Sequence, residues 1–331
     1  MRLTLSLLSL CFLAACQKEK PPVAVPKTDG SKVLVLCEGN FQWGNADFDL
    51  YLPDSNVVYR NVYKAVNGQH PGDVLQSALL VDGDIRLVLN NSGSVVTIDK
   101  ADFTFKSKIS NLGSPRYLAD FLGNLVLTDL YSGTVTTMDK NGNKRASLYT
   151  GAWTEEMLVS KGKLWVTCRN GYVYTTSDGN AWQDSIFLKK ACSWGVEDKN
   201  GKLWFLATDS GKSSLFRLDV DQHKVESRFD FAATGYAQKL AVSRNKDTVF
   251  CISGGLMAIP INASSLPASP VFEEKGANWY GLGVDPNSGI IYLANAKDYV
   301  SKGEVVMLQS NGAVVRRFAC GINPGGFLFY H

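Results

Sequence analysis

Short apolar runs separated by small polar turns recur along most of the chain. They lie at residues 33–36, 87–89, 125–127, 164–166, 203–205, 249–251 and 291–293. Their first aligned positions are 34, 87, 125, 164, 203, 249 and 291, so the steps are 53, 38, 39, 39, 46 and 42 residues. A period near forty residues is typical of the four-stranded blade of a β-propeller.

The local pattern favours strands over helices, because no long segment with a 3.6-residue period competes with these runs. The turns between them carry residue pairs that tolerate positive φ in tight hairpins, as at Asp82-Gly83, Asn141-Gly142, Asp178-Gly179, Asn200-Gly201 and Asn311-Gly312. Residues 176–182 resemble an Asp-box hairpin, so we expect Asp178 to be structural.

The two ends of the chain predict how the ring closes. Residues 327–330 follow Asn323-Pro324-Gly325-Gly326, which matches the loop before an innermost strand, whereas the first repeat begins at a second strand. We therefore expect the C-terminal strand to complete the N-terminal blade, which removes free sheet edges. The prediction is an all-β, seven-bladed propeller that forms one domain over residues 32–331.

Antiparallel order assigns the loops to two faces. If the strands of a blade are lettered A to D from the axis outward, the B–C and D–A loops share one face, and the A–B and C–D hairpins share the other. The first set holds aromatic rings beside amides, carboxylates and arginines, which suits a sizeable and partly polar ligand. The predicted ligand-binding residues are Asn40, Phe41, Trp43, Asn91, Arg116, Tyr117, Asp129, Tyr131, Trp153, Glu155, Arg169, Trp194, Tyr236, Trp279, Tyr280, Asp298 and Tyr299. Trp165 and Trp204 fall within strands and are expected in the core.

The first thirty residues are typical of an exported lipoprotein. An arginine and an apolar stretch lead to Leu13-Ala14-Ala15-Cys16, which resembles a bacterial lipobox. The sequence therefore predicts a signal peptide over residues 1–15, lipidation at Cys16 and a flexible tether over residues 16–31. Gln17 after the cysteine favours the outer membrane, and we expect a lipid-anchored protein at the cell surface, with a periplasmic orientation as the alternative.

Charge and cysteine content narrow the picture further. The chain has 34 Lys and Arg against 31 Asp and Glu, without a basic run, so no nucleic-acid partner is expected. Five cysteines follow Cys16 and none forms a C-x-x-C pair, which argues against a zinc site. Buried thiols are the expectation for Cys37, Cys168 and Cys251, and a Cys37–Cys320 disulfide is left open.

Signals for catalysis are weak. The chain has three histidines but no H-E-x-x-H motif, G-x-S-x-G elbow or phosphate-binding loop. No cofactor is expected, although Glu38, Asn91, Asp129, Glu155 and Asp298 would be the candidates for an axial calcium ion. The sequence therefore predicts a binding protein with no catalytic residues.

Several motifs resemble a known family. Residues 37–41 (CEGNF), 90–93 (NNSG), 114–117 (SPRY), 128–132 (TDLYS), 153–155 (WTE), 280–286 (YGLGVDP) and 321–325 (GINPG) are similar to YVTN-type propeller lipoproteins of Bacteroidota. That group includes surface lipoproteins that bind cobalamin and pass it to a TonB-dependent outer-membrane transporter.

The resemblance implies a surface lipoprotein that holds cobalamin or another corrinoid on its loop face and delivers it to such a transporter. The alternatives are an envelope propeller hydrolase or lactonase, and a glycan-binding or adhesion propeller.

Overall fold

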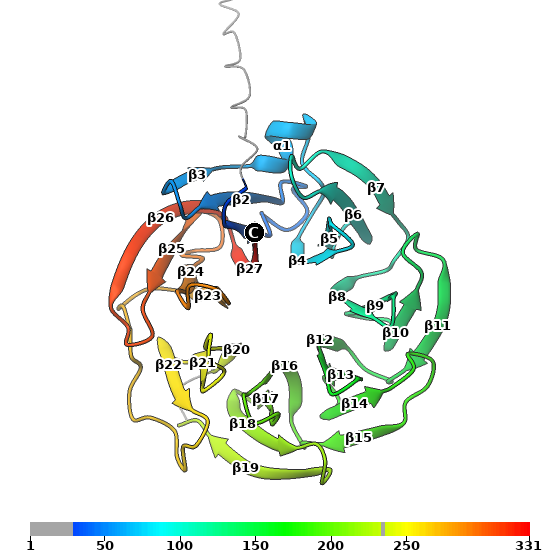
Figure 1. The fold of residues 1–331 in the computed structure, drawn as a ribbon, viewed down its shortest axis with the longest axis vertical. Helices are drawn as coiled ribbons and strands as arrows, with labels where there is room; N and C mark the ends of the chain where they lie inside the picture. Colours follow the sequence, from blue (N-terminus) through cyan, green and yellow to red (C-terminus); the bar gives the residue numbers. More distant parts are fainter. Residues whose placement is uncertain (1–28, 233–235) are drawn as a thin grey trace, which may run out of the picture.

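The computed structural model describes residues 29–232 and 236–331, and it confirms the predicted seven-bladed β-propeller. Seven sheets surround a central axis (Figure 1). The predicted signal peptide and the lipidation site Cys16 lie outside the described residues, as does the predicted tether up to residue 28.

The first four blades take up the N-terminal half of the chain. Blade 1 consists of β27 (Pro324–Tyr330), β1 (Lys32–Cys37), β2 (Asp47–Leu52) and β3 (Val57–Tyr59). Blade 2 consists of β4 (Leu75–Val81), β5 (Asp84–Leu89), β6 (Ser94–Asp99) and β7 (Phe105–Ile109). Blade 3 consists of β8 (Pro115–Phe121), β9 (Asn124–Asp129), β10 (Thr134–Met138) and β11 (Lys144–Tyr149). Blade 4 consists of β12 (Thr154–Ser160), β13 (Lys163–Cys168), β14 (Tyr172–Thr176) and β15 (Asp184–Phe187).

The remaining three blades complete the ring. Blade 5 consists of β16 (Ala191–Glu197), β17 (Leu203–Asp209), β18 (Lys212–Asp219) and β19 (Lys224–Asp230). Blade 6 consists of β20 (Gln238–Val242), β21 (Thr248–Ile252) and β22 (Leu256–Pro260). Blade 7 consists of β23 (Trp279–Val284), β24 (Ile291–Asn295), β25 (Lys302–Leu308) and β26 (Val314–Ile322).

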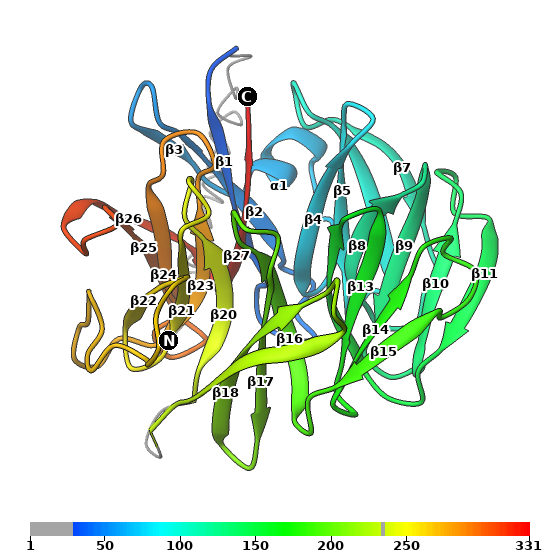
Figure 2. The ribbon, with the colours of Figure 1, turned by 60° about the horizontal axis from the view of Figure 1, so that its bottom comes forward.

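The ring closes as the sequence predicts. Strand β27 is the innermost strand of blade 1 and pairs antiparallel with β1, from Lys32 opposite Tyr330 to Cys37 opposite Pro324. The oblique view of Figure 2 shows the two strands side by side. Because the last strand of the chain pairs with the first, all seven innermost strands are hydrogen-bonded to a second strand.

Burial follows position within a blade. The second strands are apolar on both faces and buried throughout, as in β1 and β5, because neighbouring blades cover both sides of each sheet. The outermost strands face water and alternate polar with apolar residues, as in β7 and β19. Trp165 and Trp204 are buried, as predicted.

Two local departures explain the uneven repeat. The first repeat is long because helix α1 (Val62–Asn67) is inserted between β3 and β4, where the Asp47 carboxylate accepts the backbone N–H groups of Tyr63 and Lys64. Blade 6 has three strands because residues 261–270 carry Pro267 and Pro270, and a proline cannot donate to a strand ladder. A single bridge between Leu256 and Phe272 covers part of its edge.

The cysteines of the described residues are buried free thiols. Cys37 and Cys320 pack in one apolar cluster but are not joined by a disulfide. The Asp-box prediction is confirmed, because the Asp178 carboxylate accepts the backbone N–H groups of Asn180 and Ala181.

Candidate functional site: the axial cluster and the aromatic rim

Each innermost strand carries a β-bulge near its first residue. At the same point in all seven blades, the innermost strand has either one extra residue without a partner on the second strand or two residues that face a single one. The bulged residues are Gln76, Arg116, Tyr117, Glu155, Glu156, Ser193, Lys239, Tyr280 and Gly325. Bulges re-aim side chains, and innermost strands begin at the D–A loops. This set, together with Glu38 and Trp194, is the axial cluster, at the B–C and D–A end of the channel.

An arginine links three blades of the axial cluster. The Arg116 guanidinium donates to Glu155 Oε2 from Nη2 at 2.8 Å and from Nε at 3.0 Å, and its Nη1 donates to Gln76 Oε1. The Glu155 side chain is 9% exposed and that of Arg116 is 20% exposed, so water screens this ion pair poorly. Arg116 is therefore held in place by two neighbours.

A second group centres on Glu38, in the loop after β1. The Tyr280 hydroxyl lies 2.9 and 3.0 Å from the two Glu38 carboxylate oxygens. A Cβ atom on Gly325 would lie 2.6 Å from Glu38 Oε1, so only glycine leaves room for this carboxylate. Burial raises the pKa of Glu38, while the nearby Lys239 charge and the Tyr280 hydrogen bond oppose that rise.

Lys239 is the least compensated cation of the cluster. Its ammonium donates to the Gly325 carbonyl at 2.9 Å and lies 5.9 and 5.7 Å from the ring centroids of Trp194 and Tyr280. Within the described part of the chain, no carboxylate oxygen lies within 4.0 Å of it. Burial lowers its pKa, against the raising effect of Glu38 and Glu156. Two donor positions of this ammonium stay free for a ligand.

Glu156 is a carboxyl group tuned to neutral pH. Burial raises its pKa to about 7, although the Gly195 backbone N–H donates to its Oε2 at 3.2 Å and Lys239 lies nearby. A carboxyl group with a pKa close to ambient pH can both accept and return a proton. The same displacement marks functional carboxylates more often than structural ones.

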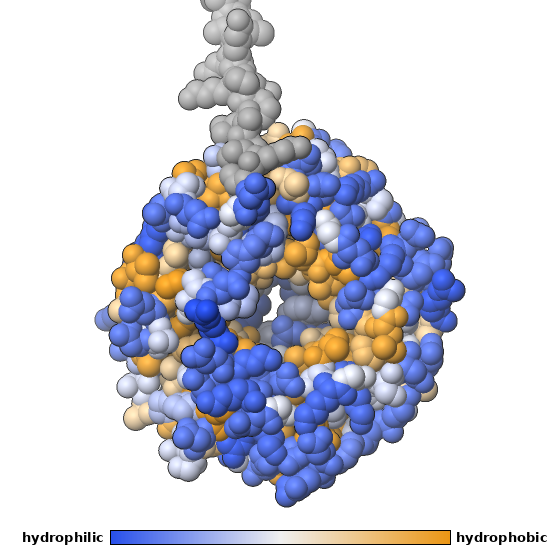
Figure 3. Space-filling model, viewed as in Figure 1, coloured by the Kyte–Doolittle hydropathy of each residue, from blue (hydrophilic) through white to orange (hydrophobic). Residues whose placement is uncertain are grey.

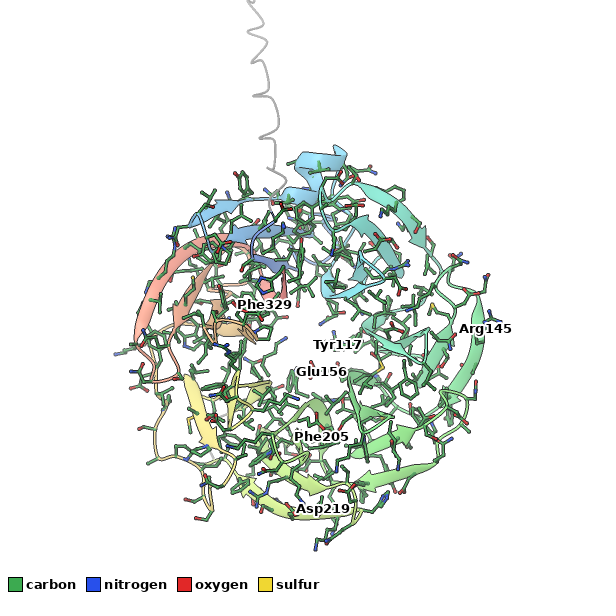
Figure 4. All side chains as sticks on the ribbon, viewed as in Figure 1. Tyr117, Arg145, Glu156, Phe205, Asp219 and Phe329 are labelled. Atoms are coloured by element: carbon green, nitrogen blue, oxygen red, sulfur yellow. The ribbon has the colours of Figure 1, made fainter. Side chains whose placement is uncertain are left out.

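Six members of the axial cluster line a hollow of about 170 Å³ at the axis: Gln76, Tyr117, Glu156, Trp194, Lys239 and Gly325. Its walls come from Leu36, Gln76, Ser77, Ala78, Tyr117, Glu156, Trp194, Lys239, Leu240, Leu282, Gly325, Gly326 and Phe327. Figure 4 shows Tyr117 and Glu156 projecting into the central opening. Figure 3 looks onto the face where β27 ends, at the opposite end of the channel, and shows apolar side chains beside the opening there. The apolar residues that line the hollow itself include Leu36, Leu240 and Phe327. Polar groups therefore meet a partly apolar wall, where electrostatic interactions are stronger than in water.

The structure brings five of the predicted site residues to the axis: Arg116, Tyr117, Glu155, Trp194 and Tyr280. Three functional residues were missed there: Gln76, Glu156 and Lys239. Only their position could have identified them in the sequence. Each lies one or two residues after the start of an innermost strand, as Arg116, Glu155 and Tyr280 do. Glu38 was expected only as a calcium ligand.

Six other predicted residues form an exposed set on the same face, which we call the aromatic rim. They are Phe41 (62% exposed), Trp43 (77%), Tyr131 (68%), Trp153 (44%), Tyr236 (50%) and Tyr299 (47%). All six lie in B–C or D–A loops. Among the described residues, the A–B and C–D hairpins of the opposite face hold no exposed aromatic side chain.

The other predicted residues have structural partners. The Asp129 carboxylate accepts the N–H groups of Ser114, Tyr131 and Ser132, and that of Asp298 accepts those of Val300 and Ser301. Both carboxylates are therefore occupied in shaping their own loops.

Four further predicted residues are also engaged within the fold. Trp279 was expected on the exposed face but is buried at 4% exposure against Phe272, because blade 6 lacks an outer strand and this ring fills the space. The Asn40 side chain bonds to Asn45 within its own loop, that of Asn91 to Asp73 of the neighbouring loop, and that of Arg169 to Ser193 of β16.

The residues considered for an axial calcium ion do not converge, since Asn91 bonds to Asp73, Asp129 to backbone N–H groups of two loops, and Asp298 to its own loop. Across residues 29–232 and 236–331, no group of three or more His, Cys, Asp or Glu side chains is placed to hold a metal ion. In the same ranges no helix has the length and apolar character needed to span a bilayer.

Comparison with known proteins establishes the fold. No protein-family model matches the sequence, and no curated protein matches it. Among solved structures, a quinonprotein alcohol dehydrogenase-like protein from Bacteroides thetaiotaomicron is 16% identical, with a TM-score of 0.69 over 90% of this chain and 78% of its own. A putative 6-phosphogluconolactonase from Bacteroides fragilis is 10% identical, with a TM-score of 0.67 over 93% and 100%. The periplasmic gluconolactonase of Pseudomonas aeruginosa is 10% identical, with a TM-score of 0.69 over 91% and 99%.

These similarities confirm the β-propeller fold. The predicted kinship with cobalamin-binding lipoproteins stays a prediction.

The prediction that the chain is not an enzyme is overturned by this comparison. It relied on the absence of catalytic motifs, yet propellers named as lactonases share the fold over more than nine tenths of this chain. Residues from separate blades can meet at the axis of a propeller without forming a local sequence motif, so the absence of such motifs does not exclude an enzyme.

Proposed function

We propose that the protein is a hydrolase whose axial cluster opens a neutral ester or lactone. The observation that carries the proposal is the pairing of Glu156, whose pKa is about 7, with the uncompensated ammonium of Lys239 in one hollow. The first group suits a general base and the second suits a developing oxyanion.

In this proposal, a water oxygen attacks the ester carbonyl carbon while the Glu156 carboxylate accepts a proton from that water. Lys239 stabilises the negative charge that forms on the carbonyl oxygen. The carbon–oxygen bond of the ester then breaks, and Glu156 returns its proton to the departing alkoxide. Arg116 and Tyr280 act as positioning residues, because Glu155 and Glu38 already occupy their polar groups.

The charges of the cluster favour a neutral substrate. Arg116 and Lys239 carry two positive charges, while Glu38 and Glu155 carry two negative charges when ionised, and Glu156 is half ionised near pH 7. The Glu156 carboxylate lines the hollow and those of Glu38 and Glu155 belong to the same cluster, so they oppose an anionic substrate and an uncharged ester or lactone is the better fit.

The test is a hydrolysis assay on the full chain purified in detergent, with glucono-δ-lactone and p-nitrophenyl acetate as probes. We expect turnover that Glu156→Gln lowers at least about 100-fold, with Lys239→Met also impaired. Tyr149→Ala, an exposed ring outside the cluster, is the matched control. Equal rates for wild type and Glu156→Gln would refute the assignment.

Cobalamin capture and delivery to a TonB-dependent transporter form the second candidate, favoured by the exposed aromatic rim. Titration with cyanocobalamin tests it, and no binding at high micromolar ligand would exclude it. Anchoring through Cys16 at the outer-membrane surface is part of both proposals.

A further inference from the structure

The aromatic rim exposes far more ring surface than its face needs for folding. Six of its rings are between 44% and 77% exposed, and none is covered by another element. All six rim rings lie in loops on the face that holds the axial cluster, and aromatic side chains on the loops of a rigid scaffold are typical of ligand-binding surfaces.

The rings are held in defined orientations. Tyr131 and Trp153 meet edge to face at 5.6 Å and 89°, and Tyr299 meets Tyr280 in the same way at 5.6 Å and 89°. The Phe41 loop is fastened to the Tyr299 loop, because Asn40 Nδ2 donates to the Tyr299 carbonyl at 3.4 Å. Ordered rings bind with a small loss of conformational entropy.

The rings are spaced around the axis and do not form one dry patch. Phe41 and Trp43 belong to blade 1, Tyr131 to blade 3, Trp153 to the link between blades 3 and 4, Tyr236 to the link between blades 5 and 6, and Tyr299 to blade 7. Polar side chains separate them, such as Asn278, which accepts the Tyr299 hydroxyl at 3.2 Å. A ligand that alternates apolar ring faces with hydroxyl groups fits this surface better than a protein hot spot, which is contiguous and dry.

Tyr280 connects the rim to the axis. Its ring contacts Tyr299 of the rim, and its hydroxyl binds Glu38 in the axial cluster. A molecule with one end in the axial hollow can therefore continue directly onto the rim.

We infer that the substrate is a neutral oligosaccharide derivative, whose ester or lactone end enters the axial hollow while its other sugar units lie on the aromatic rim. The inference rests on the proposed hydrolase function for the axial end. The apolar C–H faces of the sugar rings stack on the aromatic rings, and the hydroxyls bond to the neighbouring amides. In this inference the aromatic rim binds the sugar units, and the axial cluster hydrolyses the ester or lactone.

The test is calorimetric titration of the full chain in detergent with maltohexaose, cellohexaose, xylohexaose and mannohexaose. We expect at least one to bind, and Trp43→Ala with Tyr299→Ala, or Tyr131→Ala with Trp153→Ala, to weaken that binding at least tenfold. Phe105→Ala is the matched control, since Phe105 is 51% exposed but lies on the outer strand of blade 2. Circular dichroism checks that every variant is folded.

The outcomes separate the two proposals. Glu156→Gln should keep oligosaccharide binding, so binding without any turnover would remove the hydrolase and leave the rim as a carbohydrate site. If none of the four oligosaccharides binds, or rim variants bind as wild type does, the carbohydrate inference fails whatever the axial assay shows. Binding of cyanocobalamin that the rim variants abolish would also overturn it and assign the rim to a corrinoid.

Discussion

At the scale of single residues, Glu156 is a carboxyl group of the axial cluster whose pKa is raised from 4.5 to about 7. The surrounding wall of Leu240, Leu282 and Phe327 disfavours its charged form, and one backbone N–H does not compensate. A carboxyl group with one hydrogen-bond donor to its charged form does not stabilise the fold at neutral pH, which points to a functional role.

Its raised pKa makes a prediction about pH. Between the ordinary value of 4.5 and about 7, the folded protein keeps a proton that the unfolded chain has lost, so stability falls as pH rises through that window. Glu156→Gln should therefore raise the free energy of unfolding by up to about 3 kcal/mol at pH 8, with little effect at pH 4.5. Urea titrations at both pH values measure this. A gain that is equal at both would contradict the raised pKa.

Gly325 gives a second prediction at this scale. Its Gly325→Ala variant places a methyl group against the Glu38 carboxylate, which must then move away from Tyr280. We expect the hydrolysis rate to fall and the fold to persist, because the clash is with a side chain. Gly326→Ala is the control, because neither glycine has a positive φ and the methyl added at Gly326 meets only Leu36, at an ordinary contact distance of 3.6 Å. A normal rate in Gly325→Ala would show that the Glu38–Tyr280 contact is dispensable.

At the scale of elements, the innermost strands and their bulges decide where chemistry can occur. A regular strand alternates its side chains between the two faces of its sheet, where neighbouring blades cover them. The bulge interrupts that alternation at the loop end of the strand and turns side chains toward the axis. The same bulge in each of the seven blades therefore brings residues of seven innermost strands together in the axial cluster.

The closing strand supplies the prediction at this scale. Deletion of residues 324–331 removes β27, exposes the edge of β1 and removes the Phe327 and Phe329 rings that pack on Tyr292. We expect the shortened chain to aggregate, because an unpaired and fully buried strand edge becomes exposed. Size-exclusion chromatography and thermal melting test this. Deletion of His331 alone is the control, and a monomeric, cooperatively melting 1–323 chain would contradict the role of β27.

At the scale of the whole molecule, the ends of the described chain and the candidate site lie on opposite faces. Ser31 Oγ lies 2.9 Å from His331 Nδ1, where β1 begins and β27 ends, on the face of the A–B hairpins. The aromatic rim lies at the other end of the axis. The first described residue and the aromatic rim therefore lie at opposite ends of the axis.

Lipidation is the prediction at this scale. Cys16→Ala should move the protein from the membrane fraction to the soluble fraction without changing its hydrolysis rate or its binding, because Cys16 precedes the propeller. Fractionation with immunoblotting, and mass spectrometry of the N-terminal peptide, measure this. A Cys16→Ala protein that stays with the membrane would exclude the lipid anchor.

The sequence by itself determined the repeat, the seven blades, the closure by β27 and the face on which the functional loops lie. Period, turn chemistry and strand alternation are local properties that any blade must satisfy. It also identified Arg116, Glu155 and Tyr280, although only as members of a long list of loop residues.

Only the tertiary structure decided which of those residues meet. Glu156 and Lys239 stand 83 positions apart along the chain, and each is unremarkable in its own strand. Their pairing depends on ring closure and on bulges that single-strand patterns do not encode. The pKa of Glu156 depends in turn on walls contributed by seven other strands. Burial and proximity belong to the assembled ring, so the non-enzymatic prediction drawn from local motifs was wrong.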